Sequence, residues 1–371
     1  MKILVLTKRQ TTHNDIINNR FGRSWEIPYG LSKLGHSVRV ICLSYQNKDE
    51  GVLLTEENIS GNDIEWHSFN VGKTKICGIL KYYRKVYQLA KKIKPDVIIS
   101  MSDSVYTILG DIISKKIQCQ HFTDLQDNYE AYDSARIPGI IPLFRKAIRN
   151  CDGLICVSEL LLNKIKSEYD LTTNRTLTLI NGVSKKRFFP KDKAACRKKL
   201  NLPEHSRLLG IAGALYKDHG INTVFDGFGN LSKDCPDIHL AVAGPRDINI
   251  PNLLKIHDIG FLSHNNIPDF YNALDLAIIF NKESLHRSYA FPIKTFEILA
   301  CETPLIAAKM GPLEHFLKEY PQNLYEQENI HSFISAVKEQ LSNPTKIKIP
   351  IITWNDLVKE LESLLKSFQT K

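Results

Sequence analysis

Residues 288–308, SYAFPIKTFEILACETPLIAA, carry the clearest structural signal in the chain. Pro292 suits the first turn of an α-helix, where its missing N–H would have no partner anyway, so a helix is expected over 292–301. A short apolar segment over 304–308 then predicts a buried strand. A helix followed closely by such a strand is typical of a parallel sheet covered by helices.

The same alternation runs through the rest of the chain. In the first half we expect strands over 2–6, 37–43, 96–100, 117–122, 153–157 and 177–180. Helices between them are expected over 25–34, 82–93, 104–115, 141–150 and 159–169. A polar, basic stretch over 184–199 precedes a second series, with strands over 208–213, 239–244, 256–261 and 274–280 and helices over 222–230 and 268–273.

These two series predict an α/β protein of two doubly wound, Rossmann-like domains, residues 1–183 and 184–351. A length of 371 residues suits two domains at roughly 150 residues each. Because open α/β sheets bind ligands at the carboxyl ends of their strands, we expect the domains to face each other across a ligand-binding cleft. An amphipathic helix within 352–371 must also dock, and the first domain is its candidate partner.

Composition excludes several classes of protein. Apolar residues make up 43% and charged residues 24%, which is ordinary for a globular chain. No apolar run approaches the roughly 20 residues of a transmembrane helix, and the opening MKILVLTKRQ is too short for a signal-peptide core. Eight scattered cysteines without a CxxC pair predict reduced thiols in a cytoplasmic protein and no metal site.

The net charge of +9 is concentrated in one segment. Between Lys73 and Lys94 the chain has eight Lys or Arg residues and no acidic one, with apolar residues interleaved at helical spacing. One interpretation is the solvated outer face of a helix that covers a sheet. The other is a surface that docks on an anionic membrane. Nucleic acid is the less favoured partner, because no recognisable nucleic-acid-binding module accompanies the charge.

Lys294 and Glu297 are candidates for binding a nucleotide. The N–H groups of Ile293 and Lys294 in the first helical turn would form a phosphate pocket, to which Lys294 adds positive charge. Glu297 lies one turn later on the same side, where a carboxylate can accept hydrogen bonds from ribose hydroxyls. The alternative is an ordinary core helix whose Lys and Glu side chains point to solvent, and spacing alone does not decide between them.

Two further segments carry weaker signals. In AGALYKDHG, Gly213 ends a strand and would let a ligand approach the backbone, with Lys217 and His219 close behind. The alternative is a turn that merely connects a strand to a helix. Asn181-Gly182 predicts a turn where one domain passes to the next.

Together these segments resemble the family 4 glycosyltransferases, which have the GT-B fold. The matching positions, densest between Asn181 and Ala308, are Asn181, Gly182, Val183, Phe188–Pro190, Gly213, Leu215, Gly220, Asp258–Leu262, Ile267, Pro268, Tyr271, Ala273, Asp275, Pro292, Lys294, Glu297 and Trp354. The resemblance implies a transferase that moves a sugar from a sugar nucleotide with retention of configuration. It also implies that no catalytic metal is needed, because cations and helix dipoles stabilise the leaving diphosphate.

The resemblance assigns donor binding to nine residues of the second domain. These are Gly213, His219, Arg246, Phe261, Leu262, Phe291, Pro292, Ile293 and Glu297. Three positions depart from the family pattern: its diphosphate-binding Arg and Lys are replaced by Ala214 and His219, and the first Glu of its Glu pair by Tyr289. We therefore expect Lys217 and Lys294 to supply the missing cations, with Arg246 or Arg287 as other candidates.

The first domain offers candidates for the acceptor side. Asp124 and Asp127 follow a predicted strand in HFTDLQDNYEAY and are expected to contact the transferred sugar or the acceptor hydroxyl as catalytic residues. Helix capping and turn formation are the alternative roles for both. Arg20, Gly22 and Arg23 lie where the family has an acceptor or phosphate loop, and the two arginines could instead pair with surface carboxylates.

The leading hypothesis is a cytoplasmic glycosyltransferase, peripheral on the inner face of the membrane, that extends a glycan or lipid-linked acceptor during cell-surface polysaccharide assembly. The departures from the family pattern prompt a second hypothesis, a catalytically weak GT-B subunit that binds a partner enzyme or glycan. A GT-B sugar-nucleotide epimerase is the third.

Overall fold

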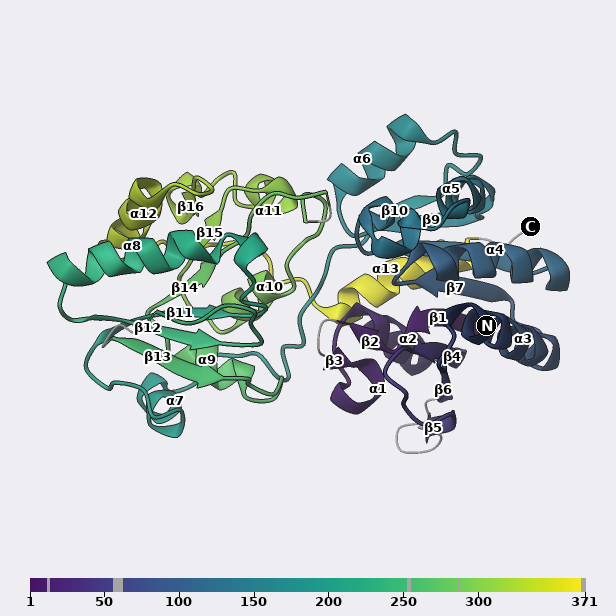
Figure 1. The fold of residues 1–371 in the computed structure, drawn as a ribbon, viewed down its shortest axis with the longest axis horizontal. Coiled ribbons are helices and arrows are strands. Elements are labelled where there is room, and N and C mark those ends of the chain that lie inside the picture. The colour runs from purple at the N-terminus through teal and green to yellow at the C-terminus, as the bar shows by residue number, and fades with distance from the viewer. Residues whose placement is uncertain (12–13, 56–62, 252–254, 286, 368–371) are drawn as a thin grey trace. The chain divides into compact units, whose positions relative to one another are not determined.

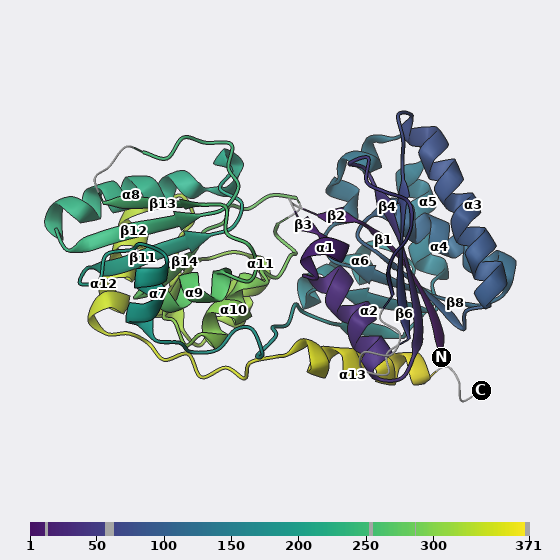
Figure 2. The same ribbon diagram turned by 90° about the horizontal axis from the view of Figure 1, so that it is seen from below.

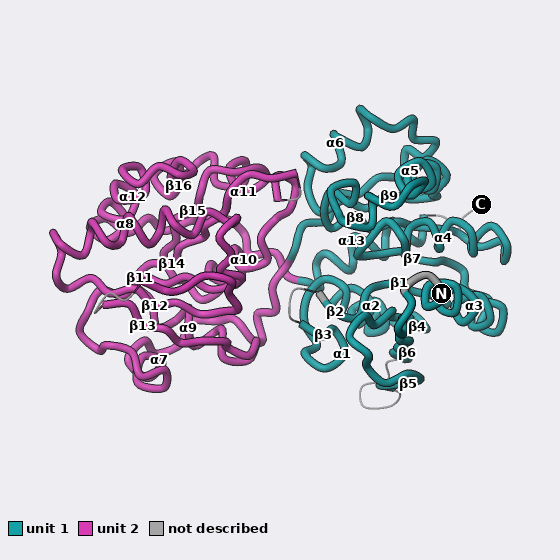
Figure 3. Tube along the Cα trace, in the orientation of Figure 1, with its two compact units in different colours: residues 1–181, 354–371 teal, residues 182–353 magenta. Residues whose placement is uncertain are grey.

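A computed structural model describes residues 1–11, 14–55, 63–251, 255–285 and 287–367 of the chain. The chain divides into two compact units, coloured separately in Figure 3. Unit 1 consists of Met1–Asn181 and Trp354–Lys371, and unit 2 of Gly182–Thr353. Each is built on its own parallel-dominated sheet with covering helices, so the predicted two-domain α/β architecture is confirmed.

Unit 1 holds an eight-stranded sheet in the order β10-β9-β8-β7-β1-β4-β6-β5. All neighbouring pairs are parallel except β5 with β6. The strands are β1 (Lys2–Lys8), β4 (Ser37–Ser44), β5 (Gly51–Thr55), β6 (Ile64–Asn70), β7 (Val97–Met101), β8 (Gln120–Leu125), β9 (Gly153–Cys156) and β10 (Thr176–Thr178). A small hairpin of β2 (Gln10–Thr11) and β3 (Asn14–Asp15) follows β1.

Helices cover both faces of this sheet. They are α1 (Ile16–Asn19), α2 (Arg23–Lys33), α3 (Lys75–Ile93), α4 (Ser104–Ile117), α5 (Ile140–Asn150), α6 (Glu159–Glu168) and α13 (Trp354–Lys366). Figures 1 and 2 show α3, α4 and α5 side by side on one face, with α2 and α13 on the other. On the first face, Tyr82 and Val86 of α3 and Tyr106 of α4 pack on Leu4 and Ile41 of the sheet.

The C-terminal helix belongs to unit 1, as predicted. Leu357, Val358, Leu361 and Leu365 of α13 are buried, and α13 packs along α2. A Cβ added at Gly30 of α2 would lie 2.6 Å from a methyl carbon of Val358, so the two helices approach closely at this glycine.

Unit 2 holds a six-stranded parallel sheet in the order β13-β12-β11-β14-β15-β16. Its strands are β11 (Arg207–Ala212), β12 (Ile238–Ala243), β13 (Ile256–Gly260), β14 (Leu276–Ile279), β15 (Leu305–Ala308) and β16 (Leu324–Tyr325). Its helices are α7 (Lys193–Lys199), α8 (Ile221–Asp234), α9 (Ile267–Ala273), α10 (Lys294–Ala300), α11 (Gly311–Phe316) and α12 (Ile330–Ser342). From β11 the chain adds β12 and β13 on one side of β11, and then β14, β15 and β16 on the other side. The strand order therefore reverses between β11 and β14.

Several predicted boundaries were wrong. Residue 117 ends α4, and β8 starts at Gln120 and continues to Leu125. The α-helix predicted over 292–301 starts at Lys294, because Pro292 and Ile293 form a preceding turn in which the Pro292 carbonyl accepts the Thr295 N–H at 3.1 Å. Strand β6 and helices α7, α11 and α12 were not predicted; α7 reads as a basic linker because only Cys196 and Arg197 among its residues are buried.

Candidate functional site

The reversal of strand order between β11 and β14 marks where unit 2 is built to hold a ligand. Parallel α/β sheets bind ligands outside the carboxyl ends of their strands at such a point. Lys294, the first residue of α10, lies there: its Nζ donates a hydrogen bond to the Ala212 carbonyl at the end of β11, at 2.9 Å. The same Nζ lies 5.2 Å from the centroid of the Phe280 ring, directly after β14. The ammonium group is therefore anchored to both strands that flank the switch point.

Two glycines keep the strand ends open beside this ammonium. Gly213 follows β11 with φ +126°, and a Cβ there would lie 2.9 Å from the Nζ of Lys294. Gly244 follows β12 with φ +134°, and a Cβ there would lie 2.0 Å from the Gly213 carbonyl oxygen. Both backbone conformations are costly for residues with a side chain. The expectation that Gly213 permits close backbone approach thus has a geometric basis.

Glu297 is buried and Lys294 is partly buried. Burial lowers the pKa of Lys294 to about 8, partly offset by Glu297. Glu297 is 6% exposed, and burial raises its pKa to about 8. Its Oε1 lies 3.9 Å from Nε2 of His264, whose own pKa burial lowers to about 3, so this imidazole is neutral at pH 7. The alternative that the Glu297 side chain points to solvent is wrong.

The raised pKa changes what Glu297 can do. A carboxyl group that titrates near pH 8 is mostly protonated at pH 7, so it can donate one hydrogen bond as well as accept others. The sequence alone predicts a carboxylate that only accepts hydrogen bonds. Either protonation state can contact a ribose hydroxyl, because a hydroxyl both donates and accepts.

His219 lies in a short turn after Gly213 and does not replace a cation. Its Nδ1 lies 3.2 Å from the Ala214 carbonyl oxygen and must donate to it, which leaves Nε2 as the acceptor. Burial, and next the charge of Arg287, lower its pKa below the usual value. Arg287 donates from Nη2 to the Asp218 carbonyl at 2.6 Å and from Nε to the Lys282 carbonyl at 3.1 Å. Arg287 thus fixes this turn to the loop after β14.

The other predicted donor-binding residues of unit 2 differ in exposure and in pairing. Lys217 is exposed, with its main-chain N–H donated to Asp247 at 3.0 Å. Arg246 forms an ion pair with Asp258 at 2.8 Å, so its charge is already neutralised. Phe261 is 61% exposed directly after β13.

The remaining donor candidates surround the start of α10 or follow β13. Leu262, Pro292 and Ile293 are partly buried. Phe291 is 3% exposed and packs between Phe296 and Phe316, with ring centroids 5.6 and 5.2 Å away. Its ring is therefore enclosed by an aromatic cluster of the core, and the donor-binding role of Phe291 stays a prediction.

In unit 1, Asp124 and Arg23 form a buried ion pair. Asp124 is 1% exposed within β8, and its carboxylate accepts from Nε of Arg23 at 2.8 Å and from Nη2 at 2.6 Å. Arg23, 3% exposed, also donates from Nη1 to the Leu179 and Ile180 carbonyls. The pair fastens β8, α2 and the segment after β10 together. Because both groups are buried and paired, the structure favours the alternative that Arg23 pairs with a carboxylate, and the catalytic role of Asp124 and the phosphate-binding role of Arg23 stay predictions.

Asp127 is less enclosed than Asp124 and remains a candidate. It is partly buried after β8, its Oδ1 accepts the Asn128 N–H at 2.8 Å, and its Oδ2 accepts from the Tyr132 hydroxyl at 3.4 Å. Arg20 is exposed with its guanidinium 5.6 Å from the Trp25 ring centroid, and Gly22 has φ +85° at the cap of α2. These three residues lie at the carboxyl-end side of the unit 1 sheet.

A chain of buried hydroxyls at the same edge was not predicted. Ser102 Oγ, after β7, lies 2.7 Å from Thr7 Oγ1 and 3.1 Å from Ser24 Oγ, which accepts from Gln126 Nε2 at 3.2 Å. Ser102 has φ +79°, an uncommon conformation for a residue with a side chain. The signal in the sequence was the SDS triplet that follows the apolar strand 97–101.

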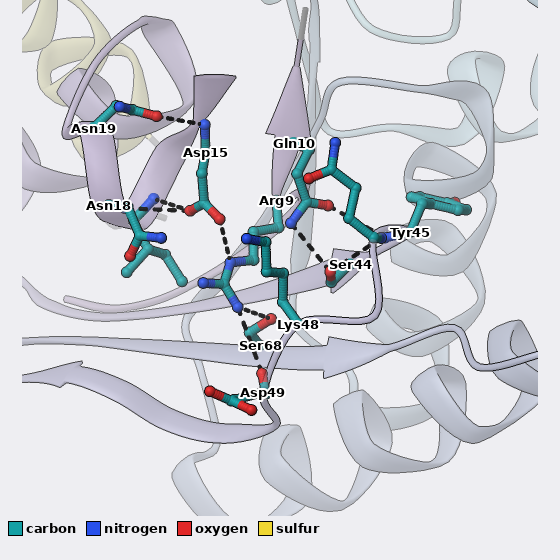
Figure 4. Close-up of polar contacts among 12 residues, drawn as sticks. Arg9, Gln10, Asp15, Asn18, Asn19, Ser44, Tyr45, Lys48, Asp49 and Ser68 are labelled. Atoms are coloured by element: carbon teal, nitrogen blue, oxygen red, sulfur yellow. Dashed lines mark hydrogen bonds and ion pairs between the residues drawn. The ribbon is translucent and has the colours of Figure 1, made fainter. Parts of the chain in front are cut away.

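A second polar cluster at this edge is drawn in Figure 4. Arg9, 4% exposed after β1, donates from Nε to Asp15 at 2.9 Å and from Nη1 to Ser68 of β6 at 3.1 Å. Gln10 donates to Ser44 of β4 at 3.0 Å. Asp15 also caps α1, so the cluster fixes the chain between β1 and the loop at 20–23.

Comparison with known proteins identifies the family. The model for glycosyl transferases group 1 matches residues 192–351, and the model for glycosyltransferase family 4 matches residues 27–187. The chain belongs to the family 4 glycosyltransferases. The predicted family resemblance is confirmed.

Individual relatives of this glycosyltransferase are distant. A teichuronic acid biosynthesis glycosyltransferase, TuaH of Bacillus subtilis (strain 168), is 23% identical over 203 residues, covering 53% of this chain and 50% of TuaH. A mannosylfructose-phosphate synthase of Agrobacterium fabrum is 25% identical over 185 residues, covering 44% of this chain and 39% of the synthase. The matches thus span about half or less of these two relatives. An uncharacterized glycosyltransferase of Methanocaldococcus jannaschii is 23% identical, covering 74% of each chain.

Solved structures agree with this glycosyltransferase along its whole length. A glycosyltransferase from Rickettsia africae superposes with a TM-score of 0.74 at 17% identity, covering 100% of this chain and 99% of the other. Anabaena HepE in complex with UDP-glucose superposes with a TM-score of 0.70 at 16% identity, covering 100% of both chains. At this identity the likeness establishes the GT-B fold.

Three features of the described residues concern metals, membranes and thiols. Within the described ranges, no three His, Cys, Asp or Glu side chains gather as metal ligands would. No helix in the described part of the chain is long and apolar enough to cross a bilayer. All eight cysteines are unpaired, and five of them are buried.

Proposed function

We propose that this glycosyltransferase transfers a sugar from a nucleotide diphosphate sugar to a glycan or lipid-linked acceptor, with retention of configuration, on the cytoplasmic side of cell-surface polysaccharide assembly. The observation that carries the donor half of the proposal is the Lys294 ammonium, anchored 2.9 Å from the Ala212 carbonyl at the switch point of unit 2. UDP-glucose is bound to the structural neighbour HepE, and TuaH is named for teichuronic acid biosynthesis.

Lys294 takes the role of the family's missing cations in this proposal. During transfer the bond between the anomeric carbon and the diphosphate oxygen breaks, and its electron pair remains on the leaving diphosphate. A fixed ammonium at that oxygen stabilises the developing charge without a metal ion. Gly213 leaves room for the phosphates beside Lys294, and Glu297 contacts the ribose hydroxyls.

Lys217 is the second cation of the proposal. Its exposed side chain follows the turn at Gly213, and among the described residues no ion pair limits its reach in the way that Asp258 limits Arg246. Asp127 in unit 1 contacts the transferred sugar or the acceptor hydroxyl. The acceptor oxygen forms the new bond to the anomeric carbon and releases its proton as the diphosphate leaves.

A donor panel tests this proposal. The protein is incubated with UDP-, GDP- and dTDP-sugars, with and without acceptors, and nucleoside diphosphate release is measured. Lys294→Met is expected to lower donor affinity and turnover at least tenfold, because a fixed charge-assisted contact to phosphate is lost. Lys233→Met, which removes an exposed lysine of α8, is the matched control and is expected to change neither. Equal activity of wild type and Lys294→Met would contradict the assignment.

Two other functions are tested by the same panel, because His219 is neutral and Ala214 and Tyr289 depart from the family pattern. Nucleotide binding without release of diphosphate, with any donor and acceptor, would favour a catalytically weak subunit that binds a partner. An isomerised donor would identify a sugar-nucleotide epimerase. Release of a nucleoside diphosphate that increases with an acceptor identifies the transferase.

A further inference from the structure

The helices on the two faces of the unit 1 sheet differ sharply in charge. Helices α3, α4 and α5 contain eleven Lys and Arg residues and one acidic residue, Asp111. Helices α2 and α13, on the opposite face, contain four basic and four acidic residues. The outward surface of α3, α4 and α5, together with the turn 136–139 before α5, is named the basic face below.

Most apolar side chains of the 73–94 segment are buried or partly buried within unit 1. Tyr82, Val86 and Ala90 of α3 are buried against the sheet, which leaves Leu80 as a large apolar residue of α3 that is more than half exposed. Lys116 of α4 donates to the Tyr83 hydroxyl at 2.8 Å. The basic side of α3 therefore matches the interpretation of a solvated outer face, and by itself it has little apolar surface to insert into a membrane.

The exposed apolar surface lies instead beside α5. Ile137 is 52% exposed and Leu143 is 49% exposed, although Phe144 and Ile148 on the inner side of α5 are buried. A shallow hollow next to them is lined by Ile141, Pro142, Arg145, Lys146, Arg149 and Asn150. It thus has apolar residues toward the N-terminus of α5 and cations toward the C-terminus.

The cations of α5 differ in their availability. Arg145 donates to both carboxylate oxygens of Glu130, at 2.7 and 2.9 Å, so its charge is neutralised within unit 1. Lys146 and Arg149 are exposed, whereas Arg136 before the helix is exposed but paired with Asp133 at 3.3 Å. Exposed cations beside protruding Ile and Leu side chains are the combination by which peripheral surfaces bind anionic bilayers, with charges at the phosphates and apolar tips among the acyl chains.

We propose that the basic face docks on an anionic lipid bilayer, with Ile137 and Leu143 entering the headgroup region and Lys146 and Arg149 contacting lipid phosphates. Long-range attraction comes from the lysines and arginines of α3. This docking is independent of donor binding in unit 2, because none of its residues belongs to that unit.

RNA fits this surface less well than lipid does. A single-stranded nucleic acid needs exposed aromatic rings on which bases stack. The tyrosines of α3 do not offer them: Tyr83 and Tyr87 are partly buried and stack on each other, with ring centroids 6.2 Å apart. Ile137 and Leu143 would gain nothing from contact with a polyanion in water.

Vesicle flotation with the full chain tests the proposal. Vesicles of phosphatidylglycerol and phosphatidylcholine are compared with vesicles of phosphatidylcholine alone. Lys146→Gln with Arg149→Gln is expected to weaken binding to the anionic vesicles about twenty-five-fold, since each cation near such a surface contributes roughly fivefold. Lys33→Gln with Lys359→Gln removes the same charge from exposed positions on α2 and α13 and is expected to leave binding within about twofold. Ile137→Ser with Leu143→Ser is expected to weaken it at least tenfold.

Several outcomes would overturn the proposal. These are no flotation of the wild-type chain, equal binding to neutral vesicles, or equal weakening by the two charge-neutralised variants. A fourth is loss of vesicle binding by Ile137→Ser with Leu143→Ser that occurs only because this variant is unfolded, which circular dichroism detects. Retention on polyuridylate without retention on vesicles would favour RNA. Donor binding measured in solution should stay unchanged in all of these variants, so failure here leaves the proposed transferase activity untouched.

Discussion

The Arg23–Asp124 pair makes the sharpest structural prediction. Asp124→Asn keeps the shape of the side chain but removes its charge, and it leaves the guanidinium of Arg23 buried with no carboxylate. Removing one partner of a buried ion pair destabilises a protein by about 3–5 kcal/mol. Because a kcal/mol shifts the melting temperature by about 3 °C for a unit of roughly 200 residues, we expect unit 1 to melt about 10 °C lower.

Calorimetry and urea unfolding measure this effect. The transition of unit 1 is expected to shift, while that of unit 2 stays in place, because Asp124 contacts unit 1 residues alone in the described structure. Arg23→Met with Asp124→Leu is expected to recover part of the loss, since neither variant side chain then carries a buried charge. An unchanged melting temperature together with abolished turnover would refute this reasoning and favour Asp124 as a catalytic residue.

Asp127→Asn is the matched comparison three residues away. Asp127 is partly exposed and accepts hydrogen bonds from the Asn128 N–H and the Tyr132 hydroxyl. With Asn the first bond can persist, and the side-chain NH2 can donate to the Tyr132 hydroxyl in place of the second. We expect a change in unfolding free energy below about 1 kcal/mol. Turnover, in contrast, is expected to fall at least tenfold if Asp127 meets the acceptor hydroxyl. Normal turnover of Asp127→Asn would remove that role.

Three further predictions concern close packing and protonation. Gly110→Ala is expected to lower the unfolding free energy by about 3 kcal/mol in urea titration, because a Cβ there would lie 2.1 Å from a side-chain oxygen of β7. Gly244→Ala is expected to reduce both melting temperature and donor affinity, because its Cβ would displace the Gly213 carbonyl. Gly35 also has a positive φ, but a Cβ there would meet nothing within 4 Å. Gly35→Ala should therefore lower the unfolding free energy by about 1 kcal/mol and leave donor affinity unchanged. Donor affinity by calorimetry is expected to be full at about pH 7 and to fall as the pH rises through 8, where Lys294 loses its proton and Glu297 gains a negative charge, each with a pKa of about 8; a flat profile would contradict this.

The sequence allowed the architecture to be predicted, because hydrophobic periodicity reports directly which side of an element is buried. Strands such as β1 and β7 are continuous apolar runs, and α13 has a clear apolar side. β6 was missed because its IEWHSFN alternates buried and half-buried residues near the sheet edge and resembles a polar segment. The short, basic α7 gave no periodic signal.

Site residues were harder to predict than elements, because their roles depend on neighbours far along the chain. Asp124 and Asp127 are of the same residue type in one motif, yet Arg23, 101 positions before Asp124, engages the first in a buried ion pair. Nothing in the local sequence announces that pairing. The hydroxyl chain through Ser102 was missed for the same reason, since it joins residues from three separate segments.

Lys294 and Lys217 carry the same charge, but their surroundings give them different expected contributions to donor affinity. The ammonium of Lys294 is held by the Ala212 carbonyl and lies over an aromatic ring, so it is already oriented before a ligand arrives. Orienting it therefore takes little further entropy when a diphosphate binds, and the low dielectric around it strengthens the attraction. The exposed Lys217 must instead be ordered from solvent, and its attraction is screened by salt. A donor-binding site that has replaced its usual Arg and Lys can thus rest mainly on one oriented, partly buried lysine. The loss of affinity on Lys294→Met should therefore exceed that on Lys217→Met at every ionic strength.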